Sequence, residues 1–215
     1  MKVSVIIPTK NEPLINELVS QLNEEIAEYD HEVIVVDKSK VPPKLKGAKL
    51  LIQKSDGLGN AFMEGVAVSK GDAILLMDGD LSHSPKDVPK LLDALKDSDI
   101  VIGSKYMKGG ATKDPFYRVI ISICSTVFAN VILGLGLSDS MSGFCAVRKK
   151  VVQSLSLNPK GFKIVLEMVY KSKGKFRVSE VPISFGRRSA GYSKATLKEM
   201  WNLLSLIARL RFTGK

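Results

Sequence analysis

Ala73-Ile74-Leu75-Leu76-Met77 is a continuous apolar run, and the carboxylates of Asp78-Gly79-Asp80 follow it directly. A strand that is apolar at every position has both faces covered, which is typical of a parallel sheet between two layers of helices. Ligands bind such sheets at the carboxyl ends of their strands. The stretch therefore predicts a buried strand that brings two carboxylates to the binding edge of an α/β fold.

Similar apolar runs occur on both sides of this stretch, with helical patterns between them. Further strands are expected at residues 3–7, 32–36, 50–52 and 100–103. The segments between them show helical spacing at residues 14–27, 59–69 and 85–96. This alternation predicts a doubly wound, mainly parallel sheet with helices on both faces.

Three carboxylates are expected at one edge of this sheet. Asp37 closes the second strand, and Asp78 and Asp80 close the fourth. Like charges gathered at one edge are unfavourable unless a positive charge neutralises them, and a divalent metal bound together with a diphosphate would do so. An Asp-x-Asp pair is a weak signal by itself, but its place after a buried strand strengthens it. Gly79 would let a sugar or ribose approach the backbone closely.

The alternation stops after residue 103, and two apolar helices are expected in its place. Residues 119–137 carry no charge and approach the length of a membrane span. At helical spacing, however, one stripe of this run is polar, comprising Arg118, Ser122, Ser125, Thr126 and Asn130. We therefore expect an amphipathic helix in a membrane interface or on the core, and a buried structural helix remains the alternative.

The second of these helices is expected at residues 194–211. Its apolar face is predicted to consist of Leu197, Met200, Trp201, Leu204, Ile207 and Ala208, and Lys194, Lys198, Arg209 and Arg211 flank that face. An apolar face with a tryptophan and basic flanks is typical of a helix on a membrane surface. The same pattern would suit a helix packed on the sheet.

The composition of the chain limits its compartment and its partners. Its 215 residues suffice for one domain, and the N-terminus is too quickly polar for a signal peptide, so a cytoplasmic protein is expected. Cys124 and Cys145 have no metal-site spacing and are expected to pack as small core residues. Residues 1–145 hold 16 Lys and Arg against 19 Asp and Glu, whereas residues 146–215 hold 16 against three. This basic C-terminal third indicates an anionic partner or a solvated basic surface.

The sequence also resembles a known family. Asp78-Gly79-Asp80-Leu81-Ser82-His83-Ser84-Pro85 is similar to a segment of the dolichol-phosphate mannose synthases of glycosyltransferase family 2. Further similar segments follow in the family's order: Val5 to Glu12, Gly103-Ser104-Lys105-Tyr106, Asp139 to Phe144, and Glu180 to Phe185 followed by Arg188, Gly191, Ser193 and Lys194. Together they cover nearly the whole chain.

The resemblance implies a GT-A fold and an inverting, Mg²⁺- or Mn²⁺-dependent transfer from a nucleotide sugar. On the donor side, it assigns the nucleotide sugar to Pro8, Asn11, Glu12, Asp37, Asp78, Gly79, Lys105 and Lys194. Asp78 and Asp80 would also hold the metal. The implied donor is GDP-mannose.

The resemblance also implies a set of residues for the acceptor, a dolichyl or polyprenyl phosphate. Arg118, Ser122, Ser142 and Gly143 would bind that acceptor, and Asp80, Arg118 and Arg188 would be catalytic. An acceptor phosphate is already anionic at neutral pH, so it needs no strong general base. A single GT-A domain over residues 1–215 is expected, in which residues 1–110 bind nucleotide sugar and metal and residues 111–215 face acceptor and membrane.

Three departures from the family pattern leave the donor open, and the mildest is Gly79, where the family commonly has alanine. Lys38 stands where the family usually has a second aspartate after the second strand, and Lys105 stands where the family has the arginine of its Gly-Ser-Arg-Tyr segment. Lysine lacks the planar fork with which arginine binds phosphate. UDP-glucose therefore remains an alternative donor.

Two other classes of function compete with this interpretation. A nucleotidyltransferase would need a glycine-rich loop after the first strand, which residues 8–12 do not provide. A non-catalytic basic adaptor for membranes or nucleic acid would have no need of Asp37, Asp78 and Asp80. We therefore expect no nucleic-acid partner, but peripheral attachment to the cytoplasmic leaflet, with or without a membrane-anchoring subunit.

Overall fold

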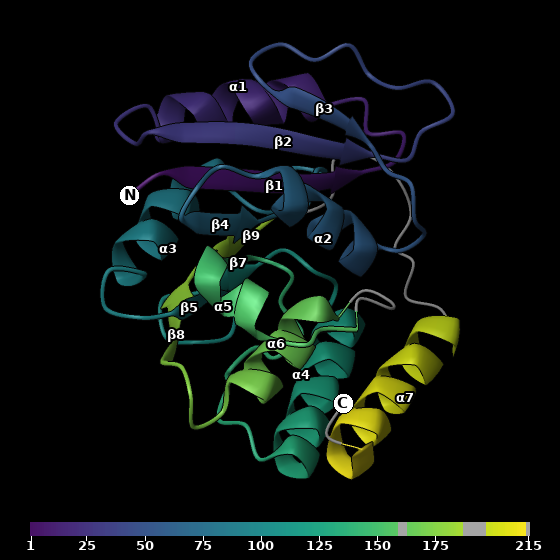
Figure 1. Ribbon diagram of the computed structural model, residues 1–215. Coiled ribbons are helices and arrows are strands. Elements are labelled where there is room, and N and C mark those ends of the chain that lie inside the picture. Colours follow the sequence, from purple (N-terminus) through teal and green to yellow (C-terminus); the bar gives the residue numbers. More distant parts are fainter. Residues whose placement is uncertain (159–162, 187–196, 214–215) are drawn as a thin grey trace.

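A seven-stranded sheet forms the centre of the computed structural model, which describes residues 1–158, 163–186 and 197–213 (Figure 1). The strand order is β3-β2-β1-β4-β7-β5-β8. Its strands are β1 (Val3–Thr9), β2 (His31–Asp37), β3 (Lys49–Ile52), β4 (Ala73–Leu76), β5 (Ile100–Ser104), β7 (Cys145–Arg148) and β8 (Val178–Pro182). All pairings are parallel except the two made by β7. The predicted α/β, mainly parallel sheet is confirmed.

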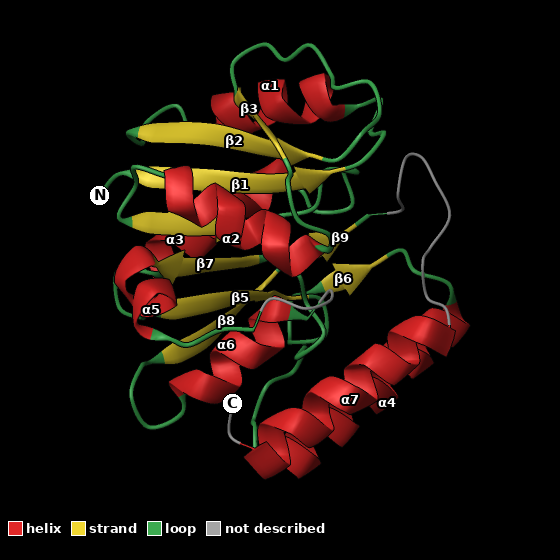
Figure 2. Ribbon diagram, turned by 45° about the vertical axis from the view of Figure 1, so that its right-hand side comes forward, coloured by secondary structure: helices red, strands yellow, loops and turns green. Residues whose placement is uncertain are grey.

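Two layers of helices cover the sheet (Figure 2). One face packs against α1 (Ile15–Glu25), the short 3-10 helix η1 (Pro85–Asp87) and α3 (Val88–Ala94). The other packs against α2 (Leu58–Val68), α5 (Lys149–Ser154) and α6 (Ile164–Ser172). Successive side chains of a strand point to opposite faces, so Val5 and Ile7 join the first core while Ile6 joins the second.

Pro8 lies inside β1, whereas the sequence predicted that the strand ends before it. β1 pairs with β2 as far as Thr9, but its pairing with β4 ends at Ile6. The carbonyl of Thr9 faces β2, where it accepts the N–H of Lys38, so the neighbouring Pro8 faces the β4 side. No ladder hydrogen bond is required there, and a proline is tolerated.

The antiparallel strand β7 was not predicted, although it determines which residues meet at the sheet edge. β7 lies between β4 and β5 and runs against both. The carboxyl edge of the parallel strands is therefore the edge at which β7 begins. Residues 138–144, which precede β7, consequently lie beside the residues that follow β4 and β5.

Two helices, α4 (Phe116–Leu133) and α7 (Leu197–Thr213), lie side by side away from the sheet (Figures 1 and 2). They share an apolar cluster with α6, formed by Ala129, Leu133, Met141, Leu166, Leu203, Leu206, Ile207 and Leu210. In α7 the predicted apolar face is only partly correct, because Met200, Trp201 and Leu204 are exposed and Ile207 is buried.

The polar stripe predicted for α4 faces the protein, and its apolar side faces outward. Thr126 is buried, and Arg118, Ser122, Ser125 and Asn130 are partly buried. The exposed apolar residues of the helix are Phe116, Tyr117, Ile120, Ile121, Ile123, Val127, Phe128, Val131 and Ile132. Cys124 is also exposed here, contrary to expectation, whereas Cys145 is buried in β7. The predicted amphipathic helix is thus present, with the orientation of a helix that offers apolar surface to a partner.

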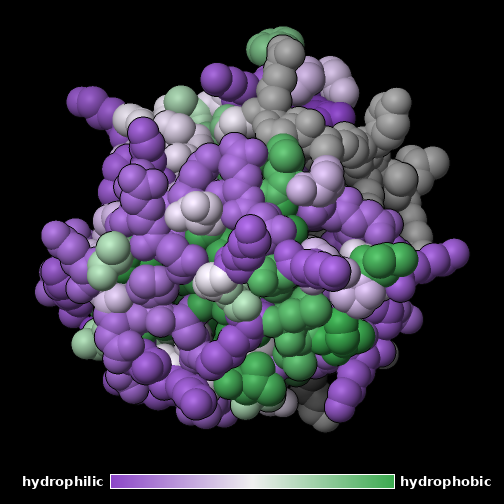
Figure 3. Space-filling model, turned by 90° about the horizontal axis from the view of Figure 1, so that it is seen from above, coloured by the Kyte–Doolittle hydropathy of each residue, from purple (hydrophilic) through white to green (hydrophobic). Residues whose placement is uncertain are grey.

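The opposite side of the molecule has a different surface. Seen from above, it is covered mainly by hydrophilic side chains around a smaller hydrophobic area (Figure 3). The edge strand β3 contributes two partly exposed apolar residues, Leu50 and Ile52. The apolar side of α4 is more extensive, since nine large apolar side chains of one helix are exposed there.

Candidate active site

The carboxyl ends of β1 and β2 form one wall of the candidate site around a buried aspartate. Asp37 is 1% exposed, and its Oδ1 accepts hydrogen bonds from Thr9 Oγ1 and Ser39 Oγ, both at 2.8 Å. Its Oδ2 accepts the N–H of Ser39 at 2.9 Å. These three donors fix the carboxylate and compensate its burial.

An open cavity of about 230 Å³ lies against this wall. Its lining comprises Thr9, Asn11, Glu12, Pro13, Asp37, Ser39, Val41 and Pro43. Asn11 has a φ of 57°, in the left-handed region that asparagine tolerates, and its N–H is bonded to Ser39 Oγ at 2.7 Å. The structure thus brings the predicted Asn11, Glu12 and Asp37 together, while the predicted Pro8 is not part of the lining.

The second wall is the turn after β4, where Asp78 and Asp80 have different surroundings. Asp80 is 7% exposed, and its Oδ1 accepts both the hydroxyl of Ser82 at 2.5 Å and its N–H at 3.1 Å. The side chain of Asp78 is 29% exposed. The turn therefore combines one carboxylate fixed within the protein with one that reaches solvent.

His83 stabilises this turn. Its Nδ1 accepts the N–H of Asp78 at 3.1 Å, and its ring stacks on Phe144 with centroids 4.7 Å apart. Burial lowers the pKa of His83, partly opposed by the nearby Asp78 and Asp80, so the neutral ring is favoured. This geometry gives His83 a packing role in the turn.

The three predicted carboxylates do not form one metal cage. Among the residues that the structure describes, no group of three His, Cys, Asp or Glu side chains is placed to hold one ion. Asp37 is instead engaged by Thr9 and Ser39. Asp78 and Asp80 alone fit Mg²⁺ or Mn²⁺, which takes one or two carboxylates when substrate phosphates supply further oxygen ligands.

Gly79 lies between these two carboxylates in the sequence and packs tightly against the end of β1. A Cβ atom at this position would lie 2.7 Å from Cγ2 of Thr9 and 3.4 Å from Cγ2 of Ile7. The end of β1 therefore leaves no room for a side chain. This packing is a structural reason for a glycine at position 79, and the sequence did not reveal it.

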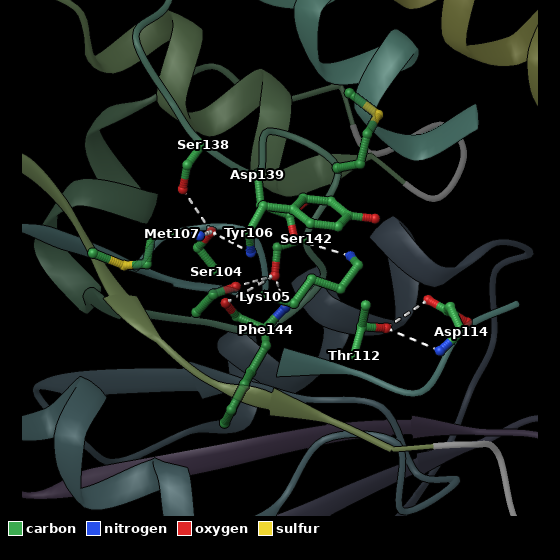
Figure 4. Close-up of polar contacts among 12 residues, drawn as sticks. Ser104, Lys105, Tyr106, Met107, Thr112, Asp114, Ser138, Asp139, Ser142 and Phe144 are labelled. Carbon is green, nitrogen blue, oxygen red and sulfur yellow. Dashed lines mark hydrogen bonds and ion pairs between the residues drawn. The ribbon is translucent and has the colours of Figure 1, made fainter. Parts of the chain in front are cut away.

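A third wall consists of the loop after β5 and the turn before β7 (Figure 4). Lys105 Nζ is 2.9 Å from Asp139 Oδ2, and the Lys105 side chain is 11% exposed. The ammonium also lies 4.7 Å from the centre of the Tyr106 ring. A Cβ atom on Gly143 would lie 3.9 Å from Asp78 Oδ1, which places this turn next to the candidate metal ligands.

The remaining predicted residues have varied positions. Ser142 is 7% exposed, and it donates its hydroxyl to the carbonyl of Gly103 at 2.7 Å, so it ties this turn to β5. Arg118 and Ser122 lie on the inward side of α4 and are partly buried. Arg188 and Lys194 lie outside the described residues.

The sequence missed several members of this site. A second cavity, of about 410 Å³, lies beyond Asp80 and is bounded by Leu81, Ser82, Ser84 and the short sheet of β6 (Ala111–Thr112) and β9 (Ser184–Phe185). Ser104, Ser138, Asp139 and Glu180 form a hydrogen-bonded group beside Lys105. Asp139 and Glu180 belong to the segments that resemble the family, which was the one available signal.

The chain is similar in sequence to known glycosyltransferases. The profile of glycosyl transferase family 2 matches residues 4–156. A dolichol-phosphate mannosyltransferase of Pyrococcus furiosus is 40% identical over 98% of the chain, which spans 64% of that relative. A dolichol-phosphate mannosyltransferase of Saccharomyces cerevisiae is 30% identical over 98% of the chain and 87% of the relative.

Solved structures support the fold. Glucosyl-3-phosphoglycerate synthase from Mycobacterium tuberculosis, in complex with Mn²⁺, uridine diphosphate and glucosyl-3-phosphoglycerate, superposes with a TM-score of 0.71 at 19% identity. The match covers 96% of this chain and 77% of that one. The similarity extends over nearly the whole chain and confirms the expected GT-A type of fold.

Proposed function

The chain belongs to glycosyltransferase family 2, and on that basis we propose that it transfers mannose from GDP-mannose to a polyprenyl phosphate such as dolichyl phosphate, with inversion at the sugar carbon. The observation that supports this most is the arrangement of three walls at one sheet edge. The cavity at Asn11, Glu12 and Asp37 adjoins the turn that carries Asp78 and Asp80. The wall that holds Lys105 and Asp139 meets that turn at Gly143.

The proposed donor site uses the first two walls. Asn11, Glu12 and Asp37 would surround the nucleotide, and Asp78 and Asp80 would hold Mg²⁺ or Mn²⁺. When bound, the metal neutralises charge on the departing diphosphate. The structural neighbours that bind Mn²⁺ and uridine diphosphate support this placement through the shared fold.

The proposed acceptor approaches from the third wall and α4. Its phosphate oxygen attacks the sugar carbon, the bond between that carbon and the diphosphate breaks, and the diphosphate takes the electron pair. Because the attacking phosphate is already anionic, no residue has to remove a proton. Lys105 and Arg118 supply positive charge for the acceptor phosphate and the departing diphosphate. Arg188 and Lys194 add to this charge, as the family resemblance implies.

We further propose that α4 and α7 place this site at the cytoplasmic surface of a membrane. Among the described residues, α4 is the helix long and apolar enough to cross one. Thr126, Ala129 and Leu133 are nevertheless buried against the rest of the fold, and β6 and β7, on either side of α4 in the chain, both join sheets of the same domain. A helix packed in this way suits the plane of the interface, with its apolar side in the lipid. Attachment through an anchoring subunit is the other outcome that a binding test would reveal.

The reaction is tested by following labelled sugar from GDP-mannose, and separately from UDP-glucose, to a short polyprenyl phosphate. We expect labelled lipid from GDP-mannose, dependent on Mn²⁺ or Mg²⁺ and lost with chelator and in Asp80→Ala. Asp97→Ala, which removes an exposed carboxylate outside the site, is the control and should retain activity. Transfer from UDP-glucose alone would replace the donor, and no lipid product from either donor would refute the proposal.

A further inference from the structure

Lys105 is held by a buried carboxylate rather than by solvent. Its ammonium contacts Asp139 at 2.9 Å, and the Asp139 side chain is only 1% exposed. The rings of Tyr106 and Phe185 lie 4.7 Å and 5.2 Å from the same ammonium. A lysine has four rotatable carbons, so its charge has a defined position only where such neighbours fix it. The position of Lys105 therefore depends on what holds Asp139.

Glu180 holds the turn that carries Asp139. Its Oε2 accepts the N–H of Ser138 at 2.8 Å, and its Oε1 accepts the hydroxyl of Ser138 at 2.9 Å and the N–H of Asp139 at 3.1 Å. Glu180 itself is placed by β8, where it pairs with Ile102 of β5. One carboxylate on the sheet thus binds three donors of a turn about 40 residues earlier in the chain.

A second connection joins this turn to the loop of Lys105. Ser104 Oγ lies 2.6 Å from Ser138 Oγ and accepts the N–H groups of Tyr106 at 3.2 Å and Met107 at 3.3 Å (Figure 4). Because the Ser138 hydroxyl donates to Glu180, the Ser104 hydroxyl donates to Ser138. The donors in this series of hydrogen bonds therefore all point toward the Glu180 carboxylate, and each bond polarises the next.

From these contacts we infer that Glu180 is a positioning residue, which acts on phosphate binding through Asp139 and Lys105. It does not line the candidate nucleotide cavity. It bonds the N–H of Asp139 directly and reaches the loop of Lys105 through Ser138 and Ser104. This inference rests on the proposed function only where it assigns a phosphate to Lys105. Replacement of Glu180 by glutamine exchanges one acceptor oxygen for an N–H donor, which would face a donor of the turn.

The link to Lys105 can be measured without any reaction. Lysines of the whole protein are acetylated with limiting acetic anhydride, and mass spectrometry compares Lys105 with the exposed Lys108 of the same loop. In Glu180→Gln we expect the labelling of Lys105 relative to Lys108 to rise about three- to tenfold. Unchanged relative labelling would overturn the inference.

Glu32→Gln is the matched control, because Glu32 also accepts three hydrogen bonds, from Ser4, Lys49 and the N–H of Lys70. It lies where β1 and β2 begin, at the opposite end of the strands from Lys105. It should leave the labelling ratio unchanged. If Glu180→Gln does not fold, Ser138→Ala removes the hydroxyl connection alone and should give the same direction of change.

A double-mutant cycle then tests whether the effect reaches the reaction. We expect kcat/KM to fall in Glu180→Gln and in Lys105→Met, and the double variant to match Lys105→Met, because the first change acts through Lys105. Losses that multiply would show a role independent of Lys105 and overturn the inference. If the wild-type protein transfers no sugar, the proposed function fails, and the labelling still decides whether Glu180 positions Lys105.

Discussion

A Cβ atom on Gly79 would lie 2.7 Å from Cγ2 of Thr9, the residue whose hydroxyl donates to Asp37. Real Cβ atoms do not approach other carbons so closely. The turn that carries the proposed metal ligands therefore packs directly on the strand that supports the nucleotide cavity. A substitution in either wall of the donor site should therefore shift the side chains of the other wall.

Gly79→Ala should thus weaken donor binding, although alanine is common at this position in the family that the sequence resembles. Thr9 would have to move, and its hydrogen bond to Asp37 would lengthen. Overpacking of this kind costs about 1–3 kcal/mol of unfolding free energy. Urea unfolding and the KM for the nucleotide sugar measure the two effects. Gly136→Ala is the control, since among the described residues no atom beyond its two chain neighbours lies within 4 Å of the added Cβ. An equal effect there would contradict the packing argument.

Lys38 stands where the family usually has an aspartate, and its side chain contacts residues 54 and 56. Its Nζ donates to the carbonyl of Lys54 at 3.1 Å and lies 3.3 Å from Asp56. Lys38→Asp should therefore not restore a better donor site, because the shorter aspartate cannot reach Lys54 or Asp56 and leaves both without the ammonium group. We expect a loss of about 0.5–1.5 kcal/mol in unfolding free energy and a higher donor KM. Lys40→Asp makes the same charge change at an exposed position, and a matching loss there would refute the specific role of Lys38.

The sequence was informative where structure depends on local pattern. Buried parallel strands are continuous apolar runs, so β1, β2, β4 and β5 were predicted within a few residues. Asp37 ends such a strand and Asp78 and Asp80 follow another, and their place at the binding edge required only the rule for parallel sheets. The outward apolar side of α4 was likewise visible as the complement of a polar stripe.

What the sequence did not show depends on pairing between distant segments. β7 is only four residues long, and nothing in Cys145–Arg148 indicates that it inserts antiparallel between β4 and β5. Without β7, the turn at Asp139 could not be placed beside Asp78. The three hydrogen bonds of Glu180 span 41 or 42 residues. The helix and strand periodicities of a sequence do not predict contacts over such a separation.

Acid should remove a contribution to stability that comes from Glu32. Burial alone would raise its pKa, but hydrogen bonds from Lys49, the N–H of Lys70 and Ser4 outweigh this effect and lower the pKa to about 2, from 4.5 for an unperturbed glutamate. A carboxyl group whose pKa is lower in the folded protein stabilises it above pH 4.5, and this contribution is lost as the pH falls toward 2.

Glu32→Gln should therefore cost about 1–3 kcal/mol of unfolding free energy at pH 7, and less as the pH is lowered. Denaturant unfolding from pH 7 to pH 3 measures the convergence of variant and wild type. Glu24→Gln removes an exposed carboxylate and should run parallel to the wild type. A difference for Glu32→Gln that stays constant with pH would show that its charge is not responsible.

The exposed side of α4 predicts binding to lipid that depends on apolar contacts. Ile120 and Val131 are 45% and 75% exposed, so changing both to serine should leave the unfolding free energy nearly unchanged. Loss of their burial in lipid should weaken binding to anionic vesicles about tenfold or more. Sedimentation at low and high salt measures this and separates the apolar part from the electrostatic part.

Val68→Ser is the control for this surface, because it also removes a half-exposed apolar side chain, but from α2. It should bind vesicles like the wild type. If the wild type does not bind vesicles at low salt, α4 contacts another protein or no partner at all. Equal losses in the two variants would show that the position on α4 is not what matters.

Glu167 of α6 should matter more to the docking of α7 than its partner Arg209. Glu167 is 1% exposed and accepts hydrogen bonds from Lys171 at 2.8 Å, from the N–H of Asn158 at 2.8 Å and from Arg209 at 3.0 Å. Within the described part of the chain, Nε of Arg209 is buried without a hydrogen-bond partner. Arg209→Met removes this unpaired group and leaves Glu167 two donors, so its cost should be small. Glu167→Gln leaves two cations without a counter-charge and should cost about 3–5 kcal/mol of unfolding free energy.

The two substitutions together distinguish an ion pair from simple packing. In the pair Glu167→Gln and Arg209→Met, one of the uncompensated cations is gone, so the double variant should be more stable than Glu167→Gln alone. Denaturant unfolding followed by circular dichroism measures the unfolding free energy of the wild type, the two single variants and the double variant. Additive losses would contradict the coupling, because they would mean that each side chain contributes to packing independently of the charge it faces.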